Sequence, residues 1–219
     1  MHIPASHGRL EALVKDPADP ARGAAVVCHP HPLHGGTMHT KAVYRAARAL
    51  NDAGLVALRF NFCGVGASTG SYDEGIAERA DLEAALDWLE AEYPELPLLA
   101  GGFSFGSLVG LSVGVDDERV VSVFGLGLPV DMDRYDYSFL AESDKPVLVV
   151  QGENDEFGSG DRVSKLLAPL GVHITLARIP GSDHYFTDRL DFTDRLDELG
   201  ATVRRYYESG SGSRFLVLI

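Results

Sequence analysis

Two segments with the pattern Gly-x-Ser-x-Gly are candidates to present a nucleophilic serine. One is GFSFG at 102–106 and the other is GASTG at 66–70. A serine becomes a good nucleophile when a neutral histidine accepts its proton, and a carboxylate then orients that histidine and stabilises the imidazolium. The chemistry to examine is therefore acyl transfer, and the surrounding elements decide which serine can take part.

The context of the two serines favours Ser104 over Ser68. A nucleophile elbow needs a buried strand directly before the serine, a helix directly after it, and small residues two positions to either side. The segment LPLLAGG before Ser104 is typical of a strand, the segment FGSLVGLSVGV after it is typical of a buried helix, and Gly102 and Gly106 flank it. Ser68 lies among glycines and no apolar run follows it, which indicates a loop.

A histidine that could serve as the base follows Ser104 in the chain. For a serine on such an elbow, the chain order is serine, acid, histidine. His173 stands at the start of a predicted strand at 172–181, where it faces neighbouring elements, whereas His184 lies in the loop PGSDHYF after that strand. A loop at the sheet edge can deliver an imidazole to the elbow, so we interpret His184 as the base.

The acid is expected just beyond the strand predicted at 146–154. Asp155 follows this strand where the chain turns, and we take it as the acid, with Glu153 as the second choice. The alternative for Asp155 is a turn residue whose carboxylate accepts hydrogen bonds from its own backbone. Asp183 adjoins His184, but neighbouring residues on an extended loop point apart, so we rank it low.

Backbone N–H groups are needed to stabilise the oxyanion that forms when a serine attacks a carbonyl. We expect one from Phe105, the residue after the nucleophile, and the second from the loop HPHPLHGGTMH at 29–39. The two prolines of this loop have no N–H, which leaves His31, Leu33 and the turn at Gly35 as donors. Among these we favour His31.

The same loop has a competing interpretation as a metal site, because histidine-rich tracts can bind metal ions. Its four imidazoles belong to His29, His31, His34 and His39. No carboxylate or cysteine joins them after the end of the strand, and the alternation of histidine with proline stiffens the loop. We therefore expect no catalytic metal, and a chelator should leave the activity unchanged.

The elements that must position these groups alternate between short apolar runs and amphipathic stretches. The apolar runs predict strands at 9–15, 23–29, 55–62, 96–102, 120–130, 146–154 and 172–181, and the periodicity predicts helices at 39–54, 73–95, 105–115, 159–170 and 185–207. Continuous apolar strands that alternate with helices predict an α/β fold with a mostly parallel central sheet and helices on both faces.

The composition indicates one globular domain, which we expect over 1–208, with 209–219 as a linker-like tail followed by a short apolar segment. A net charge of −13 without a basic run argues against nucleic acid or an anionic membrane as a partner. The N-terminus has no signal-like pattern and no apolar run reaches membrane length, so we expect a cytoplasmic protein. Cys28 and Cys63 are interpreted as buried thiols, and a homodimer stays open.

Taken together, the motifs resemble the α/β-hydrolase superfamily, and more narrowly its small bacterial serine hydrolases with an HPHPLxGG loop. The resemblance covers about 20–205 and rests on CHPHPLHGGTMHTK, LRFNFCGVGASTG, GGFSFG, GENDEFG and GSDHYF. It implies an eight-stranded type of sheet, a Ser-His-Asp triad and no cofactor, and it implies that GASTG is a strand-end loop. Cys63 stands where the resemblance implies arginine in many relatives, which removes a possible charged contact near the site.

The function that we expect is hydrolysis of small or short-chain carboxylic esters through an acyl-enzyme. The gap at 131–144, between two predicted strands, is too short for the cap domain of many α/β-hydrolases, so the site should be an open cleft. Phe103, Phe105 and Tyr185 are expected to line an apolar acyl pocket. Two alternatives stay open: a thioesterase, amidase or peptidase with the same triad, and a non-catalytic hydrolase-fold interaction module.

Overall fold

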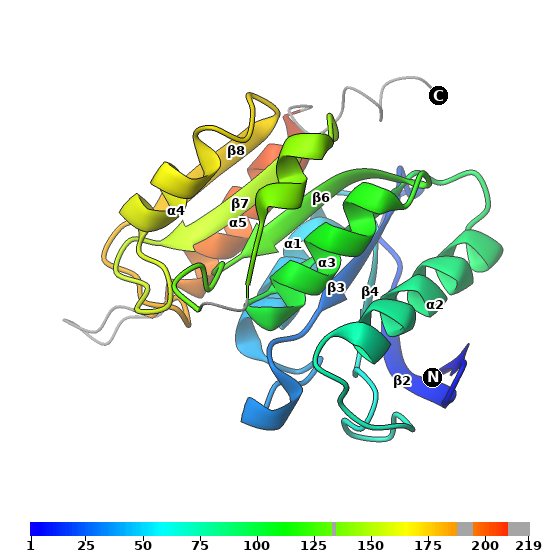
Figure 1. Ribbon diagram of the computed structural model, residues 1–219. Helices are drawn as coiled ribbons and strands as arrows, with labels where there is room; N and C mark the ends of the chain where they lie inside the picture. Colours follow the sequence, from blue (N-terminus) through cyan, green and yellow to red (C-terminus); the bar gives the residue numbers. More distant parts are fainter. Residues whose placement is uncertain (133–134, 188–194, 210–219) are drawn as a thin grey trace.

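The computed structural model describes residues 1–132, 135–187 and 195–209, and it has an eight-stranded sheet at its centre (Figure 1). The strand order is β1-β2-β4-β3-β5-β6-β7-β8. β1 and β2 are antiparallel to their neighbours, and β3 to β8 run parallel. The strands are β1 (His2–Ala5), β2 (Gly8–Lys15), β3 (Ala24–Cys28), β4 (Val56–Phe60), β5 (Leu98–Phe103), β6 (Val120–Leu126), β7 (Val147–Gly152) and β8 (Ile174–Ile179).

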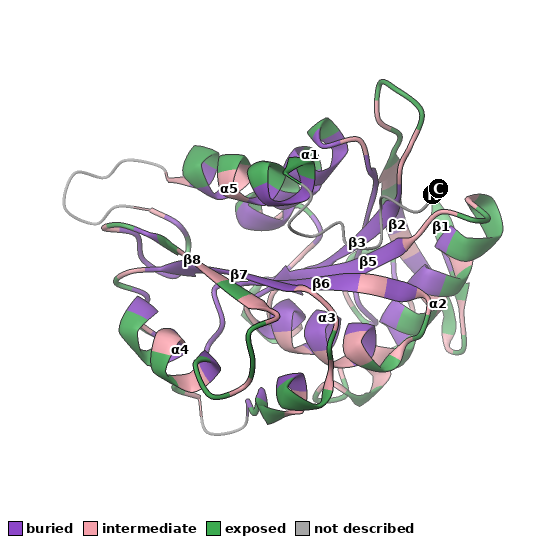
Figure 2. Ribbon diagram, turned by 90° about the horizontal axis from the view of Figure 1, so that it is seen from above, coloured by how far each residue is buried: buried purple, intermediate pink, exposed green. Residues whose placement is uncertain are grey.

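Helices cover both faces of the sheet, which confirms the predicted α/β architecture with a mostly parallel sheet. The α-helices are α1 (Lys41–Asp52), α2 (Ile76–Glu92), α3 (Phe105–Asp116), α4 (Gly160–Leu167) and α5 (Leu196–Glu208), and short 3-10 helices are η1 (Pro32–His34) and η2 (Ser138–Glu142). In the view of Figure 2, α1 and α5 lie on one face of the sheet and α2, α3 and α4 lie on the other. None of the helices in these described ranges is long and apolar enough to cross a membrane.

The core has two halves, one on each side of the sheet. β3 illustrates the division: Val26 packs into the half beneath α2 and α3, whereas its neighbour Val27 packs into the half beneath α1 and α5. Successive side chains of a strand point to opposite faces, so a strand that is covered on both sides is apolar at every position. This is why the central strands read as unbroken apolar runs in the sequence.

The sequence prediction missed β1 and misplaced the start of the last helix. The segment at 2–5 is short and contains a proline, and it becomes a strand by pairing with β2 at the edge of the sheet, where proline is tolerated. The helix predicted at 185–207 begins only at Leu196. Phe186 has a positive φ of 58°, which a helix cannot contain, and 188–194 lie outside the described residues.

Two further expectations concern the chain between and beyond these elements. In the described part of the gap at 131–144, the chain forms turns and η2, and no cap domain is built there. Of the tail predicted at 209–219, residues 210–219 lie outside the described residues. The division into one domain over 1–208 and a tail stays a prediction.

The close approach of α3 to β5 depends on glycine. A Cβ atom at Gly110 would lie 2.6 Å from the backbone of Gly101, whereas at Gly200, inside α5, the nearest atom would lie 3.9 Å away. A contact of 2.6 Å against backbone cannot be relieved by turning a side chain. The helix would have to move off the sheet, and the serine at its N-terminus would move with it.

We therefore expect Gly110→Ala to lower the free energy of unfolding by about 1–3 kcal/mol through overpacking. The matched control Gly200→Ala should raise it by about 0.5–1 kcal/mol, because alanine is the better helix former and the space is open. Urea denaturation of the two variants measures both changes. Equal behaviour of the two variants would contradict this account of the α3–β5 contact.

Candidate active site

Ser104 occupies the sharp turn between β5 and α3, as the sequence predicted. Its backbone has φ 55° and ψ −123°, a strained conformation for a residue with a side chain. The turn is held by the Ser104 N–H, which donates to the carbonyl of Leu126 on β6 at 2.9 Å. Gly106 lets the helix approach the end of β3, since a Cβ there would lie 2.4 Å from the carbonyl oxygen of His29.

A buried pair of hydroxyl groups stabilises this turn through hydrogen bonds. Ser107 Oγ donates to the carbonyl oxygen of Ser104 at 2.6 Å, so the neighbouring hydroxyl of Tyr137, 3.1 Å away, donates to Ser107. Tyr137 is fully buried, and burial raises the pKa of its hydroxyl. The strained residue is therefore tied to β6, to its own helix and to the segment between β6 and β7.

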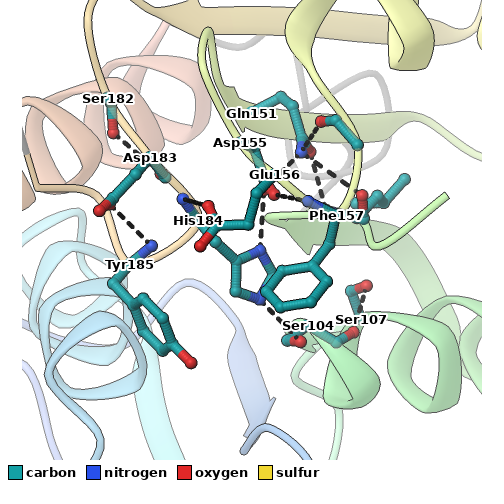
Figure 3. A network of polar contacts seen from close by, with 12 residues as sticks. Ser104, Ser107, Gln151, Asp155, Glu156, Phe157, Ser182, Asp183, His184 and Tyr185 are labelled. Atoms are coloured by element: carbon teal, nitrogen blue, oxygen red, sulfur yellow. Dashed lines mark hydrogen bonds and ion pairs between the residues drawn. The ribbon is translucent and has the colours of Figure 1, made fainter. Parts of the chain in front are cut away.

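The structure brings Ser104, His184 and Asp155 together (Figure 3). His184 Nε2 lies 2.9 Å from Ser104 Oγ, and His184 Nδ1 lies 2.8 Å from Asp155 Oδ2. The chain order is serine, acid, histidine, and each residue follows the end of a parallel strand. This is the geometry in which a histidine accepts the serine proton while the carboxylate fixes the orientation of the ring.

The alternative acids and the alternative histidine lie elsewhere. Glu153 forms an ion pair with Arg178, whose Nε donates to it at 2.8 Å, and His173 Nε2 lies 3.1 Å from the carbonyl oxygen of Leu140. The carboxylate of Asp183 points away from the imidazole of its neighbour (Figure 3). Its carboxylate accepts the backbone N–H groups of two following residues, Tyr185 at 3.0 Å and Thr187 at 2.8 Å, and so shapes the loop that carries the histidine.

The second Gly-x-Ser-x-Gly match has a structural role. Ser68 is buried, and its Oγ donates to the carbonyl oxygen of Asn61 at 2.6 Å and accepts the N–H of Glu11 at 2.8 Å. These bonds fasten the glycine-rich loop to β2. The prediction that GASTG is a loop is thus confirmed.

The loop after β3 narrows the choice of oxyanion donors. The Leu33 N–H already has an acceptor within the loop, because it donates to His31 Nδ1 at 3.2 Å. The side chain of Leu33 is exposed. His31 and Gly35 line the same cavity as Ser104. The N–H of Phe105 belongs to the first residue of α3 and has no acceptor within the helix. The assignment of His31 and Phe105 as the two donors stays a prediction.

His29 anchors this loop from inside the protein. It is fully buried, its Nδ1 donates to the carbonyl oxygen of Pro30 at 2.6 Å, and its Nε2 accepts the N–H of Phe62 at 3.0 Å. Burial lowers the pKa of His29 to about 4, so the ring is neutral at pH 7. Both nitrogens are used, and no group of three histidine, cysteine or acidic residues within the described ranges is arranged to hold a metal ion.

A cavity of about 240 Å³ opens beside Ser104. Of the three residues expected in its wall, Tyr185 lines it, but the expectation was wrong for Phe103 and Phe105. Phe103 is fully buried against the ring of His184, and Phe105 packs toward the core because the elbow turns its side chain inward. The cavity is lined by Pro30, His31, His34, Gly35, Gly36, Thr40, Ser104, Met132, Tyr135, Phe157, His184 and Tyr185.

Sequence reasoning missed Met132, Tyr135 and Phe157. They lie in the segments that follow β6 and β7, and their signal was their place beyond the carboxyl ends of parallel strands, where open α/β folds form their sites. Nothing in a single sequence tells which way the side chains of such irregular segments point. The ring of Phe157 lies edge-on to His184 with a centroid distance of 4.8 Å.

Cys63 lies in a buried acidic cluster apart from this cavity. Its Sγ lies 3.4 Å from Glu78 Oε1, and its N–H donates to Asp81 Oδ2 at 2.7 Å. The other oxygen of the same carboxylate, Asp81 Oδ1, lies 2.6 Å from His7 Nε2, so a histidine side chain pairs with this acid in the cluster. Burial raises the pKa of the Cys63 thiol, and both cysteines are free and buried, as expected.

Fold and site together define an α/β serine hydrolase homologue. The chain belongs to the α/β hydrolase family, because residues 24–205 match the family described as "Alpha/beta hydrolase domain".

Similar proteins come from several bacteria. The uncharacterized protein RP471 of Rickettsia prowazekii is 35% identical over 208 residues, which cover 91% of this chain and 87% of that protein. An alpha-beta serine hydrolase homologue from Coxiella burnetii is 33% identical with a TM-score of 0.84, over 94% and 95% of the two chains. XC6422 from Xanthomonas campestris, described as a serine hydrolase without a lid, is 32% identical with a TM-score of 0.80, over 94% and 91%.

The buried His29 predicts that acid destabilises the protein. Its pKa is about 4 in the folded state, against about 6.5 for an unfolded histidine. Between these values the unfolded chain binds a proton that the folded chain does not, so the free energy of unfolding falls as the pH decreases from about 6.5 to 4, by up to about 1.4 kcal/mol per pH unit.

Denaturant titrations of the wild type and of His29→Gln across this range measure the effect. The variant should show a flatter pH dependence, whereas His39→Gln, which removes an exposed histidine of the same loop, should keep the wild-type dependence. A wild-type slope in His29→Gln would mean that other groups cause the acid sensitivity.

Proposed function

We propose that the protein hydrolyses small, uncharged carboxylic esters, with Ser104 as nucleophile, His184 as general base and acid, and Asp155 as the group that orients the histidine. The observation that carries this proposal is the pair of contacts on the His184 ring, 2.9 Å to Ser104 Oγ and 2.8 Å to Asp155 Oδ2, at the wall of an open cavity.

In the first half-reaction, Ser104 Oγ attacks the ester carbonyl carbon while its proton passes to His184 Nε2. The charge on the carbonyl oxygen is stabilised by the N–H groups of Phe105 and His31. His184 then gives its proton to the departing alkoxide, the alcohol leaves, and the acyl group stays on Ser104. In the second half-reaction, water repeats the attack with His184 again as base, and the acid is released.

The cavity supports a small substrate. Its volume of about 240 Å³ lies below the range of about 300–1,000 Å³ that is typical of sites for drug-sized ligands. Its lining includes Met132, Tyr135, Phe157 and Tyr185, whose side chains suit an apolar acyl or alcohol group. The described gap between β6 and β7 adds no lid, so the substrate enters from an open face.

The absence of charge in the wall favours an uncharged substrate. None of the twelve lining residues is an aspartate, glutamate, lysine or arginine, and the chain as a whole has a net charge of −13. Among the described residues of the lining, an anionic substrate would meet no lysine or arginine, and the net charge of the chain would repel it outside the site. Thioesters with phosphate-bearing leaving groups are therefore disfavoured as substrates, which distinguishes the ester proposal from the thioesterase alternative with the same triad.

A non-catalytic module is disfavoured because Ser104, His184 and Asp155 are in hydrogen-bonding contact.

The nucleophile is tested by two matched serine variants. Ser104→Ala should lower kcat for para-nitrophenyl acetate and butyrate by about 10⁴-fold or more, because no other group can form the acyl-enzyme. Ser68→Ala alters the serine of the GASTG segment and should keep kcat within about twofold, although it loses buried hydrogen bonds and about 1 kcal/mol of stability. Equal activity of the wild type and Ser104→Ala would refute the proposal.

The charge preference is tested with two esters of equal length. We expect kcat/KM for para-nitrophenyl butyrate to exceed that for mono-para-nitrophenyl succinate, which carries a carboxylate at the end of the acyl chain, by at least about tenfold after subtraction of each ester's non-enzymatic rate. Met132→Lys places a cation in the wall and should narrow the ratio. Faster turnover of the succinate by the wild type would contradict an uncharged substrate.

A further inference from the structure

We infer that Gln151 is a positioning residue for the reaction, one that holds the carboxylate of Asp155 toward His184; the inference rests on the proposed function. Gln151 is the residue before the last of β7 and is fully buried, so it cannot touch a substrate. The expected mechanism of a serine hydrolase does not use it. Its side chain nevertheless contacts the oxygen atom on which the orientation of His184 depends.

The contacts of the Gln151 amide fix which way it points. Oε1 accepts the N–H of Leu128 at 2.7 Å, and Nε2 donates to Asp155 Oδ2 at 2.8 Å and to the carbonyl oxygen of Gly158 at 2.7 Å (Figure 3). The Leu128 N–H can only donate. Asp155 Oδ2, the Gly158 carbonyl oxygen and the Leu128 carbonyl oxygen, which lies 3.4 Å from Nε2, accept. A reversed amide would set oxygen against oxygen twice, so the observed orientation is the one that satisfies every partner.

These contacts place Asp155 in the hydrogen-bond geometry that a triad requires. Oδ2 receives both the Gln151 amide and His184 Nδ1, and Oδ1 receives the N–H of Phe157 at 2.8 Å. Three donors from different directions prevent rotation of the carboxylate. The amide also holds Gly158, the far end of the same turn, so one side chain fastens both ends of the segment that carries the acid.

The titratable groups around this carboxylate are few among the described residues. His184 faces it directly, and the hydroxyl of Tyr137 approaches from the segment between β6 and β7. Glu156 lies on the outer side, where it accepts the backbone N–H of His184 at 3.3 Å. Among the described residues, Gln151 is therefore the one non-titratable side chain that donates to Asp155 Oδ2, and a change there alters the acid without removing a reacting group.

A merely structural role for Gln151 is the competing explanation, since loss of any buried hydrogen bond destabilises a protein. Ser122→Ala provides the matched control. Ser122 is also fully buried and its Oγ donates to the carbonyl of Pro146 at 3.0 Å, at the opposite end of β6 and β7 from the site. It should lose stability as a Gln151 variant does, without any effect on Asp155.

The experiment measures how fast a fluorophosphonate labels Ser104, which reports the activated serine without depending on ester preference. The labelling rate is followed from pH 6 to 9, well below the Tm of each variant. Gln151→Met, which keeps the volume but not the donor, should label at least about tenfold more slowly than the wild type, whereas Ser122→Ala should stay within twofold.

Gln151→Glu provides the conservative rescue. At pH 6 the introduced carboxyl group is protonated beside the charged Asp155 and still donates one hydrogen bond, so labelling should be at least threefold faster than in Gln151→Met. The advantage should shrink toward pH 9, where two ionised carboxylates repel each other.

The inference is overturned if Gln151→Met labels within twofold of the wild type, or if Gln151→Glu labels no faster than Gln151→Met at pH 6. A wild type that labels at Ser104 but cleaves no ester contradicts the ester proposal and leaves the role of Gln151 intact. A wild type that does not label at Ser104 overturns both. Ester cleavage by the wild type together with unaffected Gln151→Met overturns the role of Gln151 alone.

Discussion

The contact of α3 with the carboxyl edge of the sheet is the constraint on which the rest of the site depends. The helix begins directly after β5, so Ser104 must adopt a positive φ of 55°. That strain persists because the surrounding backbone leaves no alternative: glycines let the helix lie against β5 and the end of β3, and the Ser104 N–H is bound to β6. The hydroxyl is fixed in space, and the other reactive groups have to be brought to it.

Those groups arrive on loops that leave the same edge of the sheet, and each loop is secured by a buried polar side chain that does not itself face the cavity. In chain order, these side chains are His29 after β3, Ser107 after β5, Gln151 in β7 and Asp183 after β8. Each forms hydrogen bonds to the backbone of its own loop or to a reactive residue. In a low dielectric such bonds are strong and an unsatisfied partner is costly, so the loops have one preferred arrangement.

The difference between the reactive groups and the buried side chains that hold their loops explains what the sequence could predict. Ser104, His184 and Asp155 were found because their chemistry has few candidates and a fixed order, and the parallel strands were found because burial on both faces makes them apolar throughout. The wall of the cavity and the role of Gln151 depend on side-chain directions in turns, which periodicity does not encode. Phe103 and Phe105 show the limit: they flank Ser104 in the chain, yet both point into the core.

A second set of residues shows why distances alone do not define a site. Thr69, His7 and Asp81 also form a chain of hydroxyl, imidazole and carboxylate, with separations of 3.1 and 2.6 Å. But the Thr69 hydroxyl accepts the N–H of Arg9 and lies within hydrogen-bonding distance of its carbonyl, so it is built into the pairing of the loop with β2. It stands on no strand-to-helix turn and does not line the cavity beside Ser104. An imidazole next to such a hydroxyl only extends a structural network, whereas the same pairing at Ser104 meets a hydroxyl that faces open space.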